Sequence, residues 1–329
     1  MRRRDFITLF GSLTAAWPCA ARAQQSERVR SVGVLIGTAD DVEGQARAVV
    51  LRQGLSELGW SEGRNIRIDY RWAGGDAAGA KADAAQLVSR KPDVIIATGT
   101  ISLAAIRYET STIPIVFVAV ADPVGQGFVL SLAHPGGNIT GFTDLDFSIG
   151  GKWLDLIREI APDLGRIAFI FNPEAAPFAD KLGELMEPVA RSLGINLRVS
   201  PTRDAAELDR ALVAVSGEPK GGLIIDPDGF TNVNRGLIIS LAARYNLPAI
   251  YPFRSYTVDG GLLSYGYDFW EPWRWLPSYV DKILKGASPA DLPVQRPTKF
   301  ELIINLKTAK ELSLTVPSQL LDRATELIE

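Results

Sequence analysis

Short apolar runs alternate with helical segments along most of this chain, and this alternation constrains its fold more than any other feature. Buried-strand patterns occupy residues 32–36, 93–97 and 115–118, and the stretches between them carry apolar or alanine residues at helical spacing. Successive strands separated by helices pair in parallel through right-handed crossovers. The sequence therefore predicts an α/β fold built on a doubly wound parallel sheet.

The same alternation starts again in the second half of the chain. A Gly- and Pro-rich stretch, residues 121–143, interrupts the rhythm and is expected to end in a short strand near Ile139. Strands and helices then follow one another up to residues 249–251, so 329 residues supply two α/β units of similar size. The last section, residues 260–329, is too short for a third unit. We expect it to complete both units, so that the chain crosses between the lobes more than once.

The first 23 residues resemble a cleaved signal peptide. Three arginines precede a short apolar stretch, and Ala21-Arg22-Ala23 provides a small-x-small cleavage site. The order Arg3-Arg4-Asp5-Phe6-Ile7 resembles the twin-arginine export pattern, and an ordinary Sec signal is the alternative. Export to the periplasm would leave 306 residues without cysteine. Removing four Arg and one Asp changes the net charge from −3 to −6.

Composition excludes most familiar chemistry. One Cys and one His cannot form a Cys- and His-based zinc site, and no metal or other cofactor is expected. A net charge of −3 without a basic block argues against binding nucleic acid. No Walker loop or G-x-S-x-G motif is present, and the partial dinucleotide motif Gly125-Gln126-Gly127 has Leu130 at its third glycine position. His134 lies in a predicted turn, so the sequence offers no nucleophile–base pair and an enzyme is disfavoured.

Polar residues nevertheless follow several predicted strands. Asp122, Asp226 and Asp228 are placed at strand carboxyl ends, where open α/β sheets bind ligands. The turn from Thr98 to Ser102 joins a strand to a helix N-terminus, where hydroxyl and backbone N–H groups suit a carboxylate. Simple helix capping is the alternative explanation for this turn.

An aromatic segment follows the strand near Tyr265. It contains Tyr267, Phe269, Trp270, Trp273 and Trp275, which either stack on a ligand or pack a helix on its sheet. Packing is the favoured reading for the tryptophans. Two prolines, at positions 272 and 277, predict that no uninterrupted helix forms here.

Several longer motifs resemble one known family. These are DPVG at residues 122–125, SLAHPGGNITG at 131–141, GGLLSYG at 260–266 and the tail LPVQRPTKFELIINLKTAKELSLTVP at 292–317. They are similar to the hallmarks of the tryptophan/tyrosine-type ABC transporter substrate-binding proteins, which have a type I periplasmic-binding-protein fold. The resemblance covers essentially the whole chain after the leader. The aromatic segment departs from the family pattern and leaves the ligand identity open.

The resemblance implies two Rossmann-like lobes joined by a three-crossover hinge, with the ligand between them. The expected N-terminal lobe is 29–146 plus 256–288, and the expected C-terminal lobe is 147–255 plus 289–329. In the family, the turn at Thr98, the strand end at Asp122 and the positions of Asn172 and Asp226 border the ligand. The full expected set of ligand-binding residues is Thr38, Thr98, Gly99, Thr100, Ser102, Asp122, Asn172, Asp226 and Tyr265.

The implied function is a periplasmic receptor of an ABC importer. It would close around a small carboxylate-bearing ligand, such as an amino acid or an aromatic acid, and deliver it to a permease in the inner membrane. The receptor is expected to act as a monomer. A periplasmic sensor domain that binds the same ligand is the alternative, and a secreted α/β enzyme is the weaker one.

Overall fold

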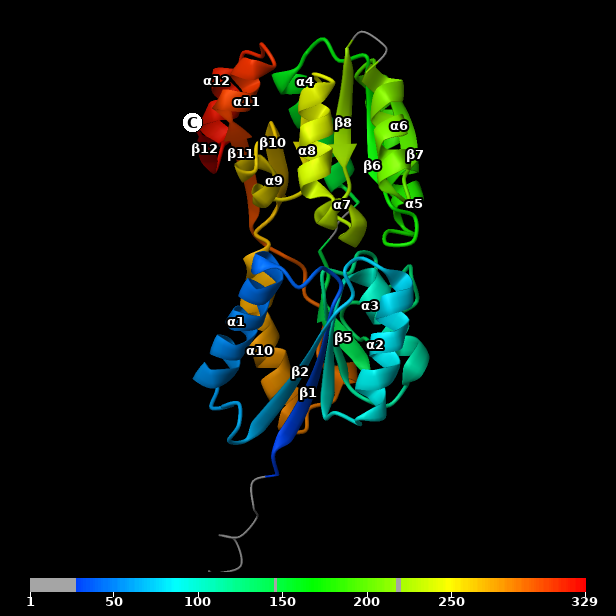
Figure 1. Cartoon of the computed structure of the whole chain (residues 1–329), viewed down its shortest axis with the longest axis vertical. Helices are drawn as coiled ribbons and strands as arrows, with labels where there is room; N and C mark the ends of the chain where they lie inside the picture. Colours follow the sequence, from blue (N-terminus) through cyan, green and yellow to red (C-terminus); the bar gives the residue numbers. More distant parts are fainter. Residues whose placement is uncertain (1–27, 145–146, 217–219) are drawn as a thin grey trace, which may run out of the picture.

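Two α/β lobes lie one above the other in the computed structural model of the chain (Figure 1). The structure describes residues 28–144, 147–216 and 220–329, so the expected signal peptide and Asp146, the last residue of the first predicted lobe segment, lie outside the described residues. The first pass through lobe 1 contains β1 (Arg30–Ile36), α1 (Val42–Glu57), β2 (Ile66–Trp72), α2 (Ala77–Ser89), β3 (Val94–Thr98), α3 (Gly99–Glu109), β4 (Ile115–Val118) and β5 (Ile139–Phe142).

Lobe 2 begins at the helix after β5 and takes most of the rest of the chain. Its elements are α4 (Ile149–Ile160), β6 (Arg166–Phe171), α5 (Ala179–Ser192), β7 (Asn196–Pro201), α6 (Ala205–Ser216), β8 (Gly221–Ile225), α7 (Gly229–Val233), α8 (Arg235–Arg244), β9 (Ala249–Tyr251), α9 (Arg254–Val258) and β10 (Leu263–Tyr267). The chain then returns to lobe 1 for α10 (Trp270–Leu284) and η1 (Pro289–Asp291). It ends in lobe 2 with β11 (Phe300–Asn305), α11 (Leu306–Glu311), α12 (Ser318–Arg323) and β12 (Glu326–Ile328).

Each lobe has its own sheet. The order is β2-β1-β3-β4-β5 in lobe 1 and β12-β11-β10-β9-β8-β6-β7 in lobe 2. All neighbouring strands are parallel except β10 and β11, which are antiparallel. Apolar side chains fill both faces of each sheet, as continuous apolar strands require. The predicted α/β class with two Rossmann-like lobes is therefore confirmed.

The chain crosses between lobes three times, but the expected boundaries differ from the observed ones. The strand Leu263–Tyr267 pairs with β9 and β11 and so belongs to lobe 2, whereas the range 256–288 was expected in lobe 1. Gln295 in turn bonds to Gly141 and Thr143 beside β5, so residues after 288 still belong to lobe 1. A buried apolar strand looks the same in either sheet, so its sequence could not reveal which sheet it joins.

The prediction that two prolines interrupt the aromatic helix was wrong, because α10 is continuous through both. Pro272 lies in the first turn, where a backbone N–H has no helical acceptor anyway. Pro277 lies inside the helix and packs against α1, where a Cβ on Gly54 would approach its Cγ to 2.5 Å. The missing side chain at Gly54 thus lets α10 lie directly on α1, beside each other in Figure 1.

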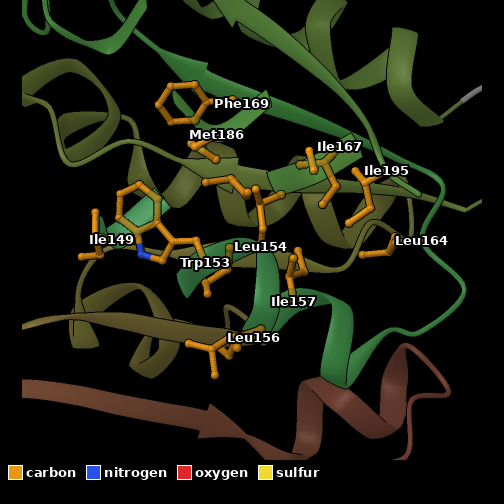
Figure 2. Close-up of a cluster of buried hydrophobic side chains, with 14 of the residues drawn as sticks. Ile149, Trp153, Leu154, Leu156, Ile157, Leu164, Ile167, Phe169, Met186 and Ile195 are labelled. Atoms are coloured by element: carbon orange, nitrogen blue, oxygen red, sulfur yellow. The ribbon is translucent and has the colours of Figure 1, made fainter. Parts of the chain in front are cut away.

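The largest buried side chain of lobe 2 organises its core. Trp153 projects from α4 into a cluster of aliphatic side chains that includes Leu154, Ile157 and Met186 (Figure 2). Its indole nitrogen donates to the backbone carbonyl of Tyr265 at 2.7 Å. This bond ties α4 to β10 and satisfies the one polar atom of the ring.

Candidate functional site

The strand orders place one topological switch point in each lobe. In lobe 1 the neighbouring strands β1 and β3 are followed by β2 on one side and β4 on the other. In lobe 2 the neighbouring strands β6 and β8 are followed by β7 on one side and β9 on the other. Open α/β sheets bind ligands beyond the carboxyl ends of the strands at such points. The residues that follow β1, β3 and β8 line a common pocket between the lobes.

This interlobe pocket has an empty volume of about 490 Å³. Both lobes and the crossover segments contribute to its lining, which consists of Gly37, Thr38, Arg47, Thr98, Gly99, Ala119, Asp144, Pro227, Asp228, Gly229, Asn232, Phe253, Phe269 and Trp273. The lobes nearly touch beside it, since a Cβ on Gly75 of lobe 1 would lie 3.6 Å from the carbonyl oxygen of Gly229 and from Val233 of lobe 2. The two lobes are therefore close together beside the pocket.

Lobe 1 presents an electropositive wall. Thr98 precedes α3, but its hydroxyl accepts from the Gly37 backbone N–H at 2.9 Å and does not cap the helix. Gly99 opens α3 with φ +79°, which brings the helix N-terminus to the pocket without a side chain in the way. Arg47, 3% exposed, donates to the hydroxyl of Thr38, and both residues line the pocket. This wall suits an anion.

Three buried carboxylates lie in or next to the lining of the pocket. Asp228 lines the pocket and accepts from the backbone N–H groups of Thr231 and Asn172, both at 2.8 Å. Asp144 lines it from the crossover after β5, and its Oδ1 atom has no hydrogen-bond partner. Asp226 is fully buried behind the pocket, and neither of its carboxylate oxygens has a partner. Buried polar atoms are rarely left unsatisfied, so these oxygens mark a place for a donor.

The three carboxylates interact with one another. Burial raises the pKa of Asp144 to about 7. Burial, followed by the charges of Asp228 and Asp144, raises the pKa of Asp226 well above its ordinary value. Burial also raises the pKa of Asp228, against the opposing effect of the N–H groups that it accepts from. A positively charged ligand group would relieve this repulsion.

Aromatic rings form the third wall. Phe253 and Phe269 meet edge to face with ring centroids 5.3 Å apart, and the guanidinium carbon of Arg47 lies 4.8 Å from the Phe269 ring centroid. Trp273 is 2% exposed and belongs to the lobe 1 core as well as to the pocket lining. Within the aromatic segment, Phe269 and Trp273 thus border the pocket, while Trp270 and Trp275 pack against the lobe 1 core.

The structure brings only some of the expected ligand-binding residues to this pocket. Thr38, Thr98 and Gly99 line it. Thr100 and Ser102 lie farther along α3, are 8% and 0% exposed, and are not part of the lining. Capping by the side chain of Thr98, the alternative for this turn, does not occur.

The remaining expected residues lie outside the lining. Asp122 has φ +38° and accepts from the N–H of Gly125 at 2.9 Å, which makes it part of its own turn. Asn172 accepts from the backbone of residues 174 and 175 and donates its own N–H to Asp228, so it supports the site indirectly. Asp226 is not part of the lining, but its charge interacts with those of Asp228 and Asp144. Tyr265 packs in the lobe 2 core and stacks on Phe300, with ring centroids 5.8 Å apart.

Most of the lining residues were outside the expected set of ligand-binding residues. Asp144 and Phe253 closely follow strands β5 and β9, so the strand-end argument applied to every strand would have found them. Arg47 lies on α1, and no local pattern marks it as a ligand contact. Phe269 lies on the second crossover and belongs to the aromatic segment, for which stacking on a ligand was one of the two interpretations of the sequence. Their placement arises only when α10 packs on α1.

Two further observations concern the described residues. No group of three or more His, Cys, Asp or Glu side chains within them is arranged to hold a metal ion. Among the helices in the described parts of the chain, none combines the length and apolar character needed to cross a bilayer.

Two parallel-sheet α/β lobes with a pocket between them at paired switch points match the type I periplasmic-binding-protein fold. The chain belongs to the family of ABC transporter substrate binding proteins, whose model matches residues 36–328. A curated relative, the tyrosine-binding protein of Clostridioides difficile strain R20291, is 28% identical over 262 residues, which are 80% of this chain and 75% of the relative.

Solved structures share the same architecture. A conserved domain protein from Vibrio cholerae is 32% identical, with a TM-score of 0.84 over 91% of this chain and 100% of that one. An ABC domain from Streptococcus pneumonia in complex with L-Trp is 22% identical, with a TM-score of 0.83 over 91% of this chain and 99% of that one. A ligand-free, open substrate-binding protein from Clostridium difficile has a TM-score of 0.66 at 24% identity, covering 91% of this chain and 99% of that one.

Proposed function

We propose that this protein is the periplasmic receptor of an ABC importer and that it binds an amino acid with an aromatic side chain. The observation that carries the proposal is the division of one pocket into an electropositive wall, a carboxylate wall and an aromatic wall. An α-amino acid zwitterion presents a carboxylate, an ammonium group and a side chain in the same arrangement. The relatives named for tyrosine and solved with L-Trp support this choice.

In this proposal the ligand carboxylate binds at the N-terminus of α3. Backbone N–H groups at Gly99 and the positive end of the helix dipole face it there, and the charge of Arg47 lies nearby. Since the protein carries a net negative charge, attraction of an anion has to be local. The proposed anion site is the turn beginning with Thr98, which the sequence also predicts, without a contact to Thr100 or Ser102.

The ligand ammonium binds between Asp144 and Asp228, with Asp226 behind them. An ammonium group offers three donors and a positive charge to carboxylates that otherwise repel one another. The side chain of the ligand then lies against Phe253, Phe269 and Trp273. Because these groups come from both lobes, they act together only in the closed cleft, so binding favours closure.

The recognition of both charged groups can be measured with three related molecules. L-Tryptophan is compared by calorimetry with L-tryptophanamide, which lacks the carboxylate, and with indole-3-propionate, which lacks the ammonium group. A hydrogen bond to a charged group contributes roughly 1.5–3 kcal/mol, so each analogue should bind about 10- to 150-fold more weakly. L-Tyrosine serves as the second complete ligand. Equal affinity for all the molecules, or no binding of either amino acid, would refute the proposed ligand class.

Export is the second part of the proposal. The first 23 residues carry the arginines, the apolar stretch and the Ala21-Arg22-Ala23 site of a cleaved leader. We expect the mature protein to begin at Gln24, which N-terminal sequencing of the periplasmic fraction can determine. Replacing Arg3 and Arg4 by Lys should block export by the twin-arginine route. An uncleaved cytoplasmic product of the unaltered gene would contradict the periplasmic location.

A further inference from the structure

We propose that a proton can take the place of the ligand's ammonium group, so that acidic conditions close the cleft without ligand. The inference rests on the proposed function, because it concerns the carboxylate wall assigned there to the ammonium. Its basis is geometric: Asp144 lines the interlobe pocket from the crossover after β5, Asp226 follows β8 of lobe 2, and both keep buried carboxylate oxygens without hydrogen-bond partners.

The groups around these carboxylates leave the closed cleft short of positive charge. Asp228 accepts two backbone hydrogen bonds but adds a third negative charge. Burial of Tyr267, followed by the charge of Asp144, raises the pKa of its phenol well above the ordinary value against the opposing charge of Arg47, so it stays neutral. Among the described residues that line the pocket, Arg47 is the cationic one, and it lies on the wall with Thr38.

Closure therefore costs free energy when all three carboxylates are ionised. Opening the lobes exposes the wall to water and restores more ordinary pKa values, whereas the closed form holds the pKa of Asp144 at about 7 and that of Asp226 higher still. A group whose pKa is higher in the closed form takes up a proton on closing. The closed form consequently gains stability as the pH falls below these raised values and loses it as the pH rises through them.

The ligand ammonium and the proton then compete for the same wall. Protonated carboxyls no longer attract an ammonium group, so acid should weaken ligand binding even though it closes the cleft. L-Tryptophan keeps its zwitterionic charges between pH 5.5 and 8, which assigns any change in affinity over this range to the protein. The carboxylate wall thus both recognises the ligand and makes closure of the cleft depend on pH.

Fluorescence energy transfer between the lobes tests directly whether pH controls closure of the cleft. The mature chain has no cysteine, so Lys81→Cys on α2 and Glu184→Cys on α5 provide exposed, unique labelling sites. Without ligand, lowering the pH from 8 to 5.5 should raise the closed-to-open ratio at least tenfold, since each proton taken up can change it tenfold per pH unit. A ratio that does not change with pH overturns the proposal.

Two variants locate the effect. Asp226→Asn imitates the protonated carboxyl, so it should be largely closed at pH 8 as well and should lose most of the pH dependence. Asp155→Asn, a matched change at an exposed position on α4, should follow the unaltered protein. If Asp226→Asn keeps the full pH response, the assignment to this carboxylate wall is wrong.

Calorimetry with L-tryptophan gives an independent readout that does not depend on variants. At pH 5.5, binding should release protons, so the measured binding heat should change with the ionisation enthalpy of the buffer. The Kd at pH 5.5 should be at least tenfold higher than at pH 8. Binding without proton release would contradict the proposed pH-dependent closure while leaving the proposed function intact. Absence of binding at both pH values would count against the proposed function. The energy-transfer result without ligand would still decide whether closure depends on pH.

Discussion

A tryptophan in place of Gly229 should hold the cleft open and weaken binding of L-tryptophan by about 100-fold or more. Gly229 begins α7 and lines the pocket, with the carbonyl oxygen of Gly37 in lobe 1 only 3.9 Å from the position of an added Cβ. An indole at this position occupies the space into which lobe 1 closes. The ligand then keeps the contacts of one lobe only, and losing two hydrogen bonds to its charged groups accounts for at least this loss.

Two control variants distinguish steric blocking of lobe closure from damage to the fold. Gly229→Ala adds only a Cβ at ordinary contact distance, so it should bind normally. Gly236→Trp adds the same indole on α8, where nothing lies within 4 Å of an added Cβ, and it should also bind normally. Small-angle scattering should show ligand-induced compaction for both controls and none for Gly229→Trp. Wild-type affinity in Gly229→Trp would refute closure as the basis of binding.

The fold could be predicted because its signals are local and repeated. Each strand is a short apolar run, each helix has its own spacing, and their alternation leaves a doubly wound sheet as the consistent solution. The lobe boundary was harder, because β10 is largely buried and its sequence does not indicate which sheet it joins. Only its pairing with β9 and β11, made by segments far apart in the chain, assigns it to lobe 2.

The candidate site shows the same limit. The strand-end argument indicated Thr98 and Gly99, and both line the interlobe pocket, because residues at the end of a parallel strand face this edge of the sheet. Ser102, one turn farther along α3, is fully buried outside the lining, and its Oγ lies 3.3 Å from the position of a Cβ added at the lining residue Gly37. Arg47 and Phe269 meet across α1 and the second crossover, a contact that no local pattern encodes.

The second large effect concerns stability rather than binding. Trp153→Ala should lower the free energy of unfolding of lobe 2 by roughly 3–5 kcal/mol, the usual cost of removing a buried large aromatic side chain. Trp153 is fully buried, and its loss would leave a cavity among Leu154, Ile157 and Met186 (Figure 2). It would also leave the carbonyl of Tyr265 without its indole donor. Trp153→Phe keeps most of the ring, so its smaller cost should be mainly that of the lost hydrogen bond, about 1–3 kcal/mol.

Because each lobe has its own sheet and its own apolar clusters, this change should also divide unfolding into two steps. Scanning calorimetry of Trp153→Ala should show lobe 2 melting about 10 °C lower, while lobe 1 melts near its original temperature. L-Tryptophan at 100 times its Kd binds only when both lobes are folded, and it should recover about 2.7 kcal/mol of the loss. A single unshifted transition would mean that Trp153 does not organise the lobe 2 core. Two transitions that L-tryptophan leaves unchanged would mean that the ligand does not bridge the lobes.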